Sequence, residues 1–135
     1  MRKSNITATF KADIHTIWDI ITNNKDYAWR SDLSKIIILK DSNSFTEYTK
    51  DGYQTDFTIT VKEPYSRYEF NMENKNFTGH WIGIFSETQN KGTKIDFTEE
   101  LHIKSPIMEL LSHLFMNLKK MQETYIADLR KKLGE

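Results

Sequence analysis

Apolar and polar side chains alternate over most of residues 35–104, and turn signals interrupt this alternation at short intervals. The signals are the stretches DSNS at 41–44, Asp51-Gly52, Pro64, ENKN at 73–76 and QNKG at 89–92. A two-residue period is typical of strands that bury one face, and short polar connections favour antiparallel neighbours. The pattern predicts an antiparallel meander with strands near 35–40, 44–50, 54–62, 66–73, 77–88 and 92–104.

The residues before this meander predict one more strand and two short helices. Residues 4–11 alternate like a strand, and Asp13 is suited to cap a helix with apolar residues at helical spacing, namely Ile14, Ile17, Trp18 and Ile21. We interpret Trp18 as structural, packing this helix onto the sheet. A second helical turn is predicted within 24–31.

The C-terminal residues predict one long amphipathic helix. Ser105 and Pro106 suit its first turn. An apolar stripe then continues through Ile107, Leu111, Leu114, Leu118, Met121, Tyr125, Leu129 and Leu133. The spacing predicts a helix at about 106–132. Its first half is apolar over a wider arc, so we expect that half to be more deeply buried.

Composition excludes several functional classes. The 135 residues, 38% of them hydrophobic, are enough for one core, so a single domain over 1–135 is expected. Nineteen basic residues balance nineteen acidic ones without forming blocks, which argues against a nucleic-acid partner. There is no cysteine, and the four histidines lack metal-ligand spacing, so neither a metal nor a cofactor is expected. No apolar run follows the basic N-terminal pair, which predicts a cytoplasmic protein without membrane insertion.

These elements predict an α+β fold in which a curved antiparallel seven-stranded sheet wraps around the C-terminal helix, with two short helices after the first strand. Gly79 and Gly83 would permit curvature or close approach in one strand. The order resembles the helix-grip fold of the START and Bet v 1-like superfamily. It is most similar to the bacterial polyketide cyclase/dehydratase-like branch, whose members are called SRPBCC proteins. Three stretches carry the resemblance: residues 12–39, residues 79–97 with their Gly-Thr hairpin, and residues 105–111.

The resemblance implies a cavity between the sheet and the final helix. Known members bind lipids, sterols, polyketides or other apolar molecules there, some catalyse cyclisation or dehydration, and others bind a client protein. Strand parity and the resemblance together give these candidate lining residues: Trp29, Phe57, Ile59, Tyr68, Phe70, Trp81, Phe85, Phe97, Glu99, Leu111, Phe115 and Leu118. In the sixth strand either Trp81 and Phe85 or His80, Ile82 and Ile84 could face inward. We favour the first pair because the resemblance places bulky residues there.

Glu99 interrupts an apolar row formed by Ile95, Phe97, Leu101 and Ile103. A lone ionised carboxylate inside a cavity is costly, and burial raises its pKa. Three roles remain open: a structural pair with a buried tyrosine hydroxyl or Arg30, orientation of a ligand's polar end, or general acid–base catalysis.

We therefore expect a protein that binds a small hydrophobic molecule, and a homodimer is compatible with the sequence. A cyclase or dehydratase in the same cavity and an interaction module similar to Hsp90 activators are the alternatives. No paired titratable groups with catalytic spacing are visible, so no catalytic residue is assigned.

Overall fold

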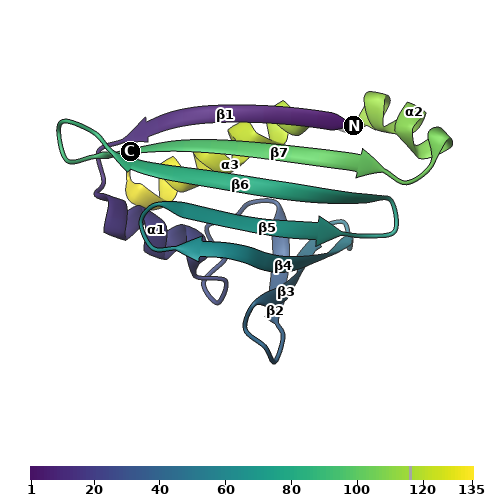
Figure 1. Cartoon of the computed structure of the whole chain (residues 1–135), viewed down its shortest axis with the longest axis horizontal. Helices are drawn as coiled ribbons and strands as arrows, with labels where there is room; N and C mark the ends of the chain where they lie inside the picture. The colour runs from purple at the N-terminus through teal and green to yellow at the C-terminus, as the bar shows by residue number, and fades with distance from the viewer. Residues whose placement is uncertain (116) are drawn as a thin grey trace.

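The structure is a computed structural model that describes residues 1–115 and 117–135, with side chains described outside 111–116. The described residues form one seven-stranded sheet in the order β1-β7-β6-β5-β4-β3-β2 (Figure 1). The strands are β1 (Arg2–Phe10), β2 (Leu33–Ile38), β3 (Ser44–Thr49), β4 (Gln54–Glu63), β5 (Arg67–Glu73), β6 (Phe77–Glu87) and β7 (Thr93–Ile103). Every neighbouring pair is antiparallel, which confirms the predicted meander.

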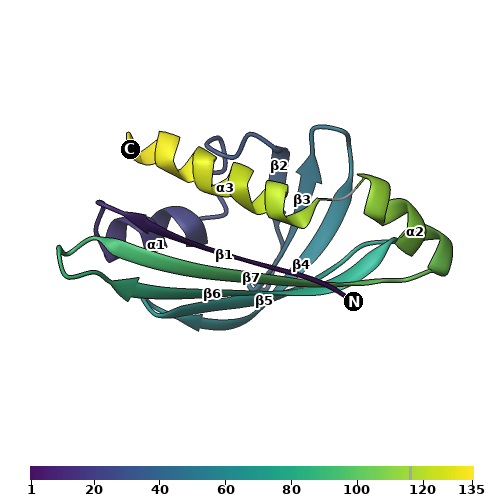
Figure 2. The same ribbon diagram turned by 90° about the horizontal axis from the view of Figure 1, so that it is seen from above.

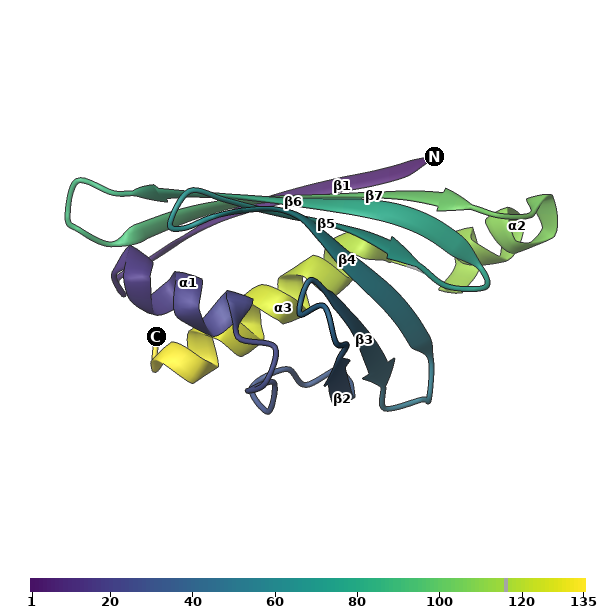
Figure 3. The ribbon, with the colours of Figure 1, turned by 60° about the horizontal axis from the view of Figure 1, so that its bottom comes forward.

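Two helices lie on one face of this sheet. Helix α1 (Ile14–Thr22) begins at Asp13, whose carboxylate accepts a hydrogen bond of 3.0 Å from the backbone N–H of Thr16. Helix α3 (Leu118–Leu133) crosses the same face, and β4, β3 and β2 bend towards it (Figures 2 and 3). The core lies between the helices and the curved sheet, where Ile17, Ile95 and Leu129 are completely buried.

The C-terminal segment differs from the single helix that its apolar stripe predicts. It contains helix α2 (Pro106–Phe115) and then α3, which starts after Asn117. Asn117 has an extended backbone and its side chain accepts a 3.0 Å hydrogen bond from Lys120 N–H, which is the geometry of a helix N-cap. An N-cap side chain does not alter the apolar spacing, so the stripe could not show this boundary.

The deep burial predicted for the first half of this segment is wrong for residues 106–110, whose side chains are described. Ile107 and Leu110 are 74% and 68% exposed, and α2 extends past the end of the sheet (Figure 1). Leu111 and Phe115, both predicted to line the cavity, lie outside the residues whose side chains are described.

The second short helix predicted after β1 is absent from the described structure. Residues 24–32 form turns, with hydrogen bonds from Asp26 N–H to Asn23 O and from Arg30 N–H to Tyr27 O. The Asn23 side chain also accepts a hydrogen bond from Lys25 N–H. Asparagine side chains that bond nearby backbone in this way compete with helix formation.

In β6 the favoured register is confirmed. Trp81 and Phe85 are buried and face the helices, whereas Ile84 is 43% exposed on the other face. Gly83 lies between the two buried aromatic residues. A Cβ atom at this position would be 2.6 Å from Cη2 of Trp81, so the absence of a side chain is what lets the indole lie over the strand. The close approach predicted for this glycine is therefore confirmed.

Replacing Gly83 by Ala is expected to displace the Trp81 indole, because Phe70 and Phe97 pack against it at centroid distances of 4.8 and 4.6 Å. Overpacking of this kind costs about 1–3 kcal/mol. Urea unfolding measures the loss of stability, and near-ultraviolet circular dichroism reports the environment of the indole. Ser86→Ala, on the exposed face of the same strand, is the control. Equal stability of Gly83→Ala and the wild type would contradict this packing.

None of the described helices is long and apolar enough to span a membrane.

Candidate functional site

A cavity of about 180 Å³ lies between the curved sheet and the helices. Strands β3 to β7 form its floor and one wall, α3 covers it, and the turn segment between α1 and β2 closes one side. Its described lining includes Asp32, an exposed residue, and Met121, which is 53% exposed. The cavity therefore opens to solvent beside these two residues.

The apolar wall of the cavity is a continuous aromatic row that crosses the sheet. Pairing of β3 with β4 places Phe45 opposite Phe57, and their rings stack with centroids 4.9 Å apart. Pairing of β5 with β6 places Phe70 opposite Trp81, and these rings stack with centroids 4.8 Å apart. Phe57 contacts Phe70 edge-on and joins the two pairs, and Phe97 links them to α3 through a tilted contact with Trp81 and an edge contact with Tyr125. The aromatic row comprises Phe45, Phe57, Phe70, Trp81, Phe97 and Tyr125.

Six of the predicted lining residues face this cavity: Phe57, Tyr68, Phe70, Trp81, Phe97 and Glu99. Four others belong to the surrounding core and do not line the cavity. The Trp29 ring packs against Tyr125 with centroids 5.2 Å apart, and the Phe85 ring contacts Trp18 with centroids 5.0 Å apart. Ile59 and Leu118 belong to the same hydrophobic core. The role of these residues in ligand binding stays a prediction.

The polar lining includes residues that were not selected from the sequence: Arg30, Asp32, Glu47, Gln122 and Tyr125. Glu47 could have been found by strand parity, because it shares a face of β3 with the buried Phe45. This is the same pattern that singled out Glu99. Arg30 and Asp32 lie in a turn segment without periodicity, where sequence offers no such signal.

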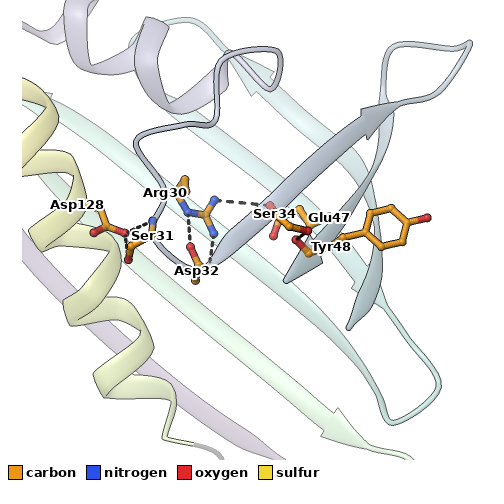
Figure 4. A network of polar contacts seen from close by, with 7 residues as sticks. All are labelled: Arg30, Ser31, Asp32, Ser34, Glu47, Tyr48 and Asp128. Atoms are coloured by element: carbon orange, nitrogen blue, oxygen red, sulfur yellow. Dashed lines mark hydrogen bonds and ion pairs between the residues drawn. The ribbon is translucent and has the colours of Figure 1, made fainter. Parts of the chain in front are cut away.

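Arg30 is the centre of a largely buried charge cluster (Figure 4). Its guanidinium donates two hydrogen bonds to Asp32, at 3.2 and 3.1 Å, and lies 3.6 Å from the Glu47 carboxylate. The side chains of Arg30 and Glu47 are only 15% and 16% exposed. The guanidinium also lies over the Tyr125 ring, 4.7 Å from its centroid.

The turn segment that carries Arg30 is fixed to α3. The Asp128 carboxylate accepts hydrogen bonds from the backbone N–H and the hydroxyl of Ser31, both at 2.8 Å (Figure 4). This attachment determines where Arg30 enters the cavity. The guanidinium is thereby held between β3 and α3.

Burial and the neighbouring charges shift the pKa values of Arg30 and Glu47 in opposite directions. Burial alone lowers the pKa of Arg30, but the carboxylates of Glu47 and Asp32, together with Tyr125, raise it above its usual value. Burial raises the pKa of Glu47, and Arg30 partly offsets that rise. Arg30 therefore stays charged, and it is what makes an ionised Glu47 tolerable in this position.

Glu99 faces the cavity from β7, where its cross-strand neighbours are Ser4 and Trp81. Its carboxyl group has no hydrogen bond or ion pair with any described residue, and Arg30 binds Asp32 and Glu47 instead. Burial raises the pKa of Glu99 to about 7, the Glu47 carboxylate adds to the rise, and Arg30 opposes it. Neither structural pairing considered from the sequence, with Arg30 or with a tyrosine hydroxyl, is formed.

Tyr68 supplies a second unsatisfied polar group. The residue is 2% exposed, and its hydroxyl has no hydrogen-bond partner among the described residues. Asn24 lies close enough to influence the pKa of this phenol, which burial raises, but not in hydrogen-bonding geometry. An unpaired buried hydroxyl costs about 1–3 kcal/mol.

The outer face of β4 to β7 carries a wider, open depression with a polar lining. Several polar side chains on this face form hydrogen bonds or ion pairs with one another. His80 lies between Asn71 at 2.6 Å and Glu69 at 2.8 Å, and Lys104 lies 3.2 Å from Glu73. The described residues contain no group of acidic and histidine side chains arranged to hold a metal. The inner cavity, with its unpaired groups, is the stronger candidate site.

No protein-family model matches the sequence, and no curated protein matches it. Solved structures are similar in fold. The Bacillus cereus protein XoxI superposes with a TM-score of 0.79 at 12% identity, over 98% of this chain and 95% of that one. A START superfamily protein from Mycobacterium smegmatis gives a TM-score of 0.67 at 15% identity, over 94% of this chain and 98% of that one. DynU16, a putative protein of the dynemicin biosynthetic locus, gives 0.73 at 12% identity, over 98% of this chain and 47% of that one.

The fold comparison agrees with the all-antiparallel sheet and the C-terminal helix across it. Identities of 12–15% establish shared architecture without transferring activity. The comparison therefore confirms the helix-grip fold predicted from the sequence, an architecture shared with this START superfamily protein and with DynU16.

Proposed function

We propose that the protein binds a small, ring-sized apolar molecule in the cavity between the sheet and α3. The aromatic row carries this proposal, because it provides a continuous apolar wall that leads to a few polar groups at one side. Apolar lining with sparse polar groups is the usual construction of a small-molecule site.

The cavity volume favours a compact ligand. Typical ligand pockets measure about 300–1,000 Å³, and an apolar cavity of about 150 Å³ in another protein binds benzene. A cavity of about 180 Å³ therefore suits one ring with a short substituent, rather than a long lipid chain or a fused polyketide. Its opening beside Asp32 and Met121 gives such a molecule access.

Binding is better supported than catalysis in this cavity. A general acid or base usually has a second titratable group within hydrogen-bonding reach. Glu99 has none among the described residues, and the Glu47 carboxylate is held by Arg30. We therefore assign Glu99 and Tyr68 to ligand orientation.

Toluene is a suitable neutral probe for this proposal. Titration followed by ¹H–¹⁵N NMR is expected to show saturable one-to-one binding that shifts the indole N–H signal of Trp81, and excess toluene should raise the melting temperature by mass action. Thr55→Trp, which fills the cavity from β4, is expected to abolish binding. The control Thr58→Trp lies on the exposed face of the same strand and should bind normally. Absence of saturable binding, or equal binding by Thr55→Trp, would contradict the proposal.

A further inference from the structure

The charges around the cavity are unequal in sign. Its described lining contains three carboxyl groups, those of Asp32, Glu47 and Glu99, but only one basic side chain, that of Arg30. Arg30 is already used, because it forms two hydrogen bonds with Asp32 and an ion pair with Glu47. With all three carboxyl groups ionised, the described part of the lining has an excess of negative charge and no second basic side chain to balance Glu99.

The polar side chains beside Glu99 are also occupied. The hydroxyl of Ser4, its neighbour in β1, donates a 2.7 Å hydrogen bond to the Gln122 side-chain oxygen. The Gln122 amide in turn donates to the carbonyl oxygens of Ser4 and Phe97, at 3.1 and 3.4 Å. The other cross-strand neighbour, Trp81, contributes an aromatic ring to the row. Glu99 is thus an acceptor inside the cavity for which the described residues supply no donor.

Tyr68 is a second residue of the cavity whose polar group lacks a hydrogen-bond partner among the described residues. Tyr68 lines the cavity from β5, two strands away from Glu99, and its buried hydroxyl has no partner among the described residues. A hydroxyl can accept a hydrogen bond as well as donate one. Glu99 and Tyr68 are thus two residues of one cavity whose oxygen atoms find no hydrogen-bond partner among the described residues, and a hydrogen-bond donor on a ligand would satisfy Glu99.

We propose that the ligand is a ring-sized apolar molecule bearing a protonated amine, and that Glu99 binds the ammonium group. The inference rests on the proposed function and names the class of ligand. Hydrogen bonds between two ionised groups are shorter and stronger than neutral ones, and a partner offsets the cost of the buried carboxylate. An anionic ligand such as a carboxylate would meet three carboxyl groups instead.

Three probes with the same ring separate the charge types: benzylamine, benzyl alcohol and benzoate. At pH 8 benzylamine is expected to bind at least about tenfold more tightly than benzyl alcohol, because its ammonium group pairs its charge with the Glu99 carboxylate whereas the alcohol offers only a neutral donor. Benzoate should bind most weakly. Glu99→Gln should lower the benzylamine affinity about tenfold and lower the benzyl alcohol affinity by less, so that the preference for the amine is largely lost. Glu100→Gln, on the outer face of β7, should change neither.

A pH series on the wild type tests the inference without any substitution. Burial raises the pKa of Glu99 to about 7, so its ionised fraction falls between pH 8 and pH 6, while benzylamine stays protonated. Benzylamine affinity should therefore fall over this interval by more than benzyl alcohol affinity. Among the described residues, the other titratable side chains that line the cavity are those of Arg30, Asp32, Glu47, Tyr68 and Tyr125. The Glu99→Gln variant shows how much of the pH dependence belongs to them.

The outcomes distinguish this inference from the proposed function. Saturable binding of benzyl alcohol or benzoate that equals or exceeds that of benzylamine overturns the inference while leaving apolar binding in place. A benzylamine affinity that is independent of pH and of Glu99 overturns it as well. If none of the three probes binds the cavity, the proposed function fails together with the inference.

Discussion

Glu99→Gln is expected to stabilise the ligand-free protein at pH 8 by up to about 3 kcal/mol, because one unit of pKa shift corresponds to about 1.4 kcal/mol. Burial raises the pKa of this carboxyl from 4.5 to about 7. Ionising Glu99 is therefore harder in the folded protein than in the unfolded chain. Glutamine keeps the size of the side chain and removes the charge.

The sign of the effect follows from that raised pKa. Below about pH 4.5 Glu99 is protonated in both states, so glutamine gives little gain. As the pH rises through 4.5 to about 7, the wild type loses stability relative to the variant, and above pH 7 the difference is constant. Urea unfolding of both proteins from pH 4 to pH 8 measures this difference. Glu100→Gln makes the same change on the outer face, where it should produce no such gain. A Glu99→Gln variant less stable than the wild type at pH 8 would instead indicate a structural partner.

Arg30→Met is expected to cost about 3–5 kcal/mol of stability, because it leaves the buried Glu47 carboxylate without its partner. Methionine keeps much of the apolar stem and removes the guanidinium that joins Asp32, Glu47 and the Tyr125 ring. Since burial raises the pKa of Glu47, the loss should shrink in acid, where the unpaired carboxylate takes up a proton. Denaturant unfolding at pH 5 and pH 8 measures both effects.

Two further variants complete this experiment. Arg30→Met/Glu47→Gln should recover most of the lost stability, because the only carboxylate of the cluster then left without Arg30 is that of Asp32, whose side chain is 45% exposed to water. Arg67→Met removes a guanidinium that pairs with Glu69 at the surface, where its side chain is 43% exposed, so it should cost less than about 1 kcal/mol. Equal losses for Arg30→Met and Arg67→Met would show that the Arg30 cluster is solvated rather than buried.

The strands and their order could be predicted because a two-residue period and short turn signals specify an antiparallel meander almost directly. The inward direction of Glu99 followed from the same parity. The division between α2 and α3 could not be predicted, since Asn117 caps α3 without disturbing the apolar stripe. The turns at 24–32 were not predicted either, because the Asn23 side chain accepts a hydrogen bond from the local backbone where a helical turn was expected.

The polar half of the site was harder to predict than the aromatic half. Phe57, Phe70, Trp81 and Phe97 follow from parity along individual strands. The Arg30 cluster joins a turn, β3 and α3, and it depends on the contact between Ser31 and Asp128, 97 residues apart in the chain. A single sequence carries no periodic signal for a contact of that kind.

The most direct test of the site is the pKa of Glu99 itself, measured by ¹³C NMR titration of its side-chain carboxyl carbon in the ligand-free protein. An unpaired carboxyl inside the cavity should titrate at about 7. A midpoint at or below the ordinary 4.5 would mean that Glu99 is solvated or paired, and it would contradict both the ligand-orienting role of Glu99 and the preference for an amine.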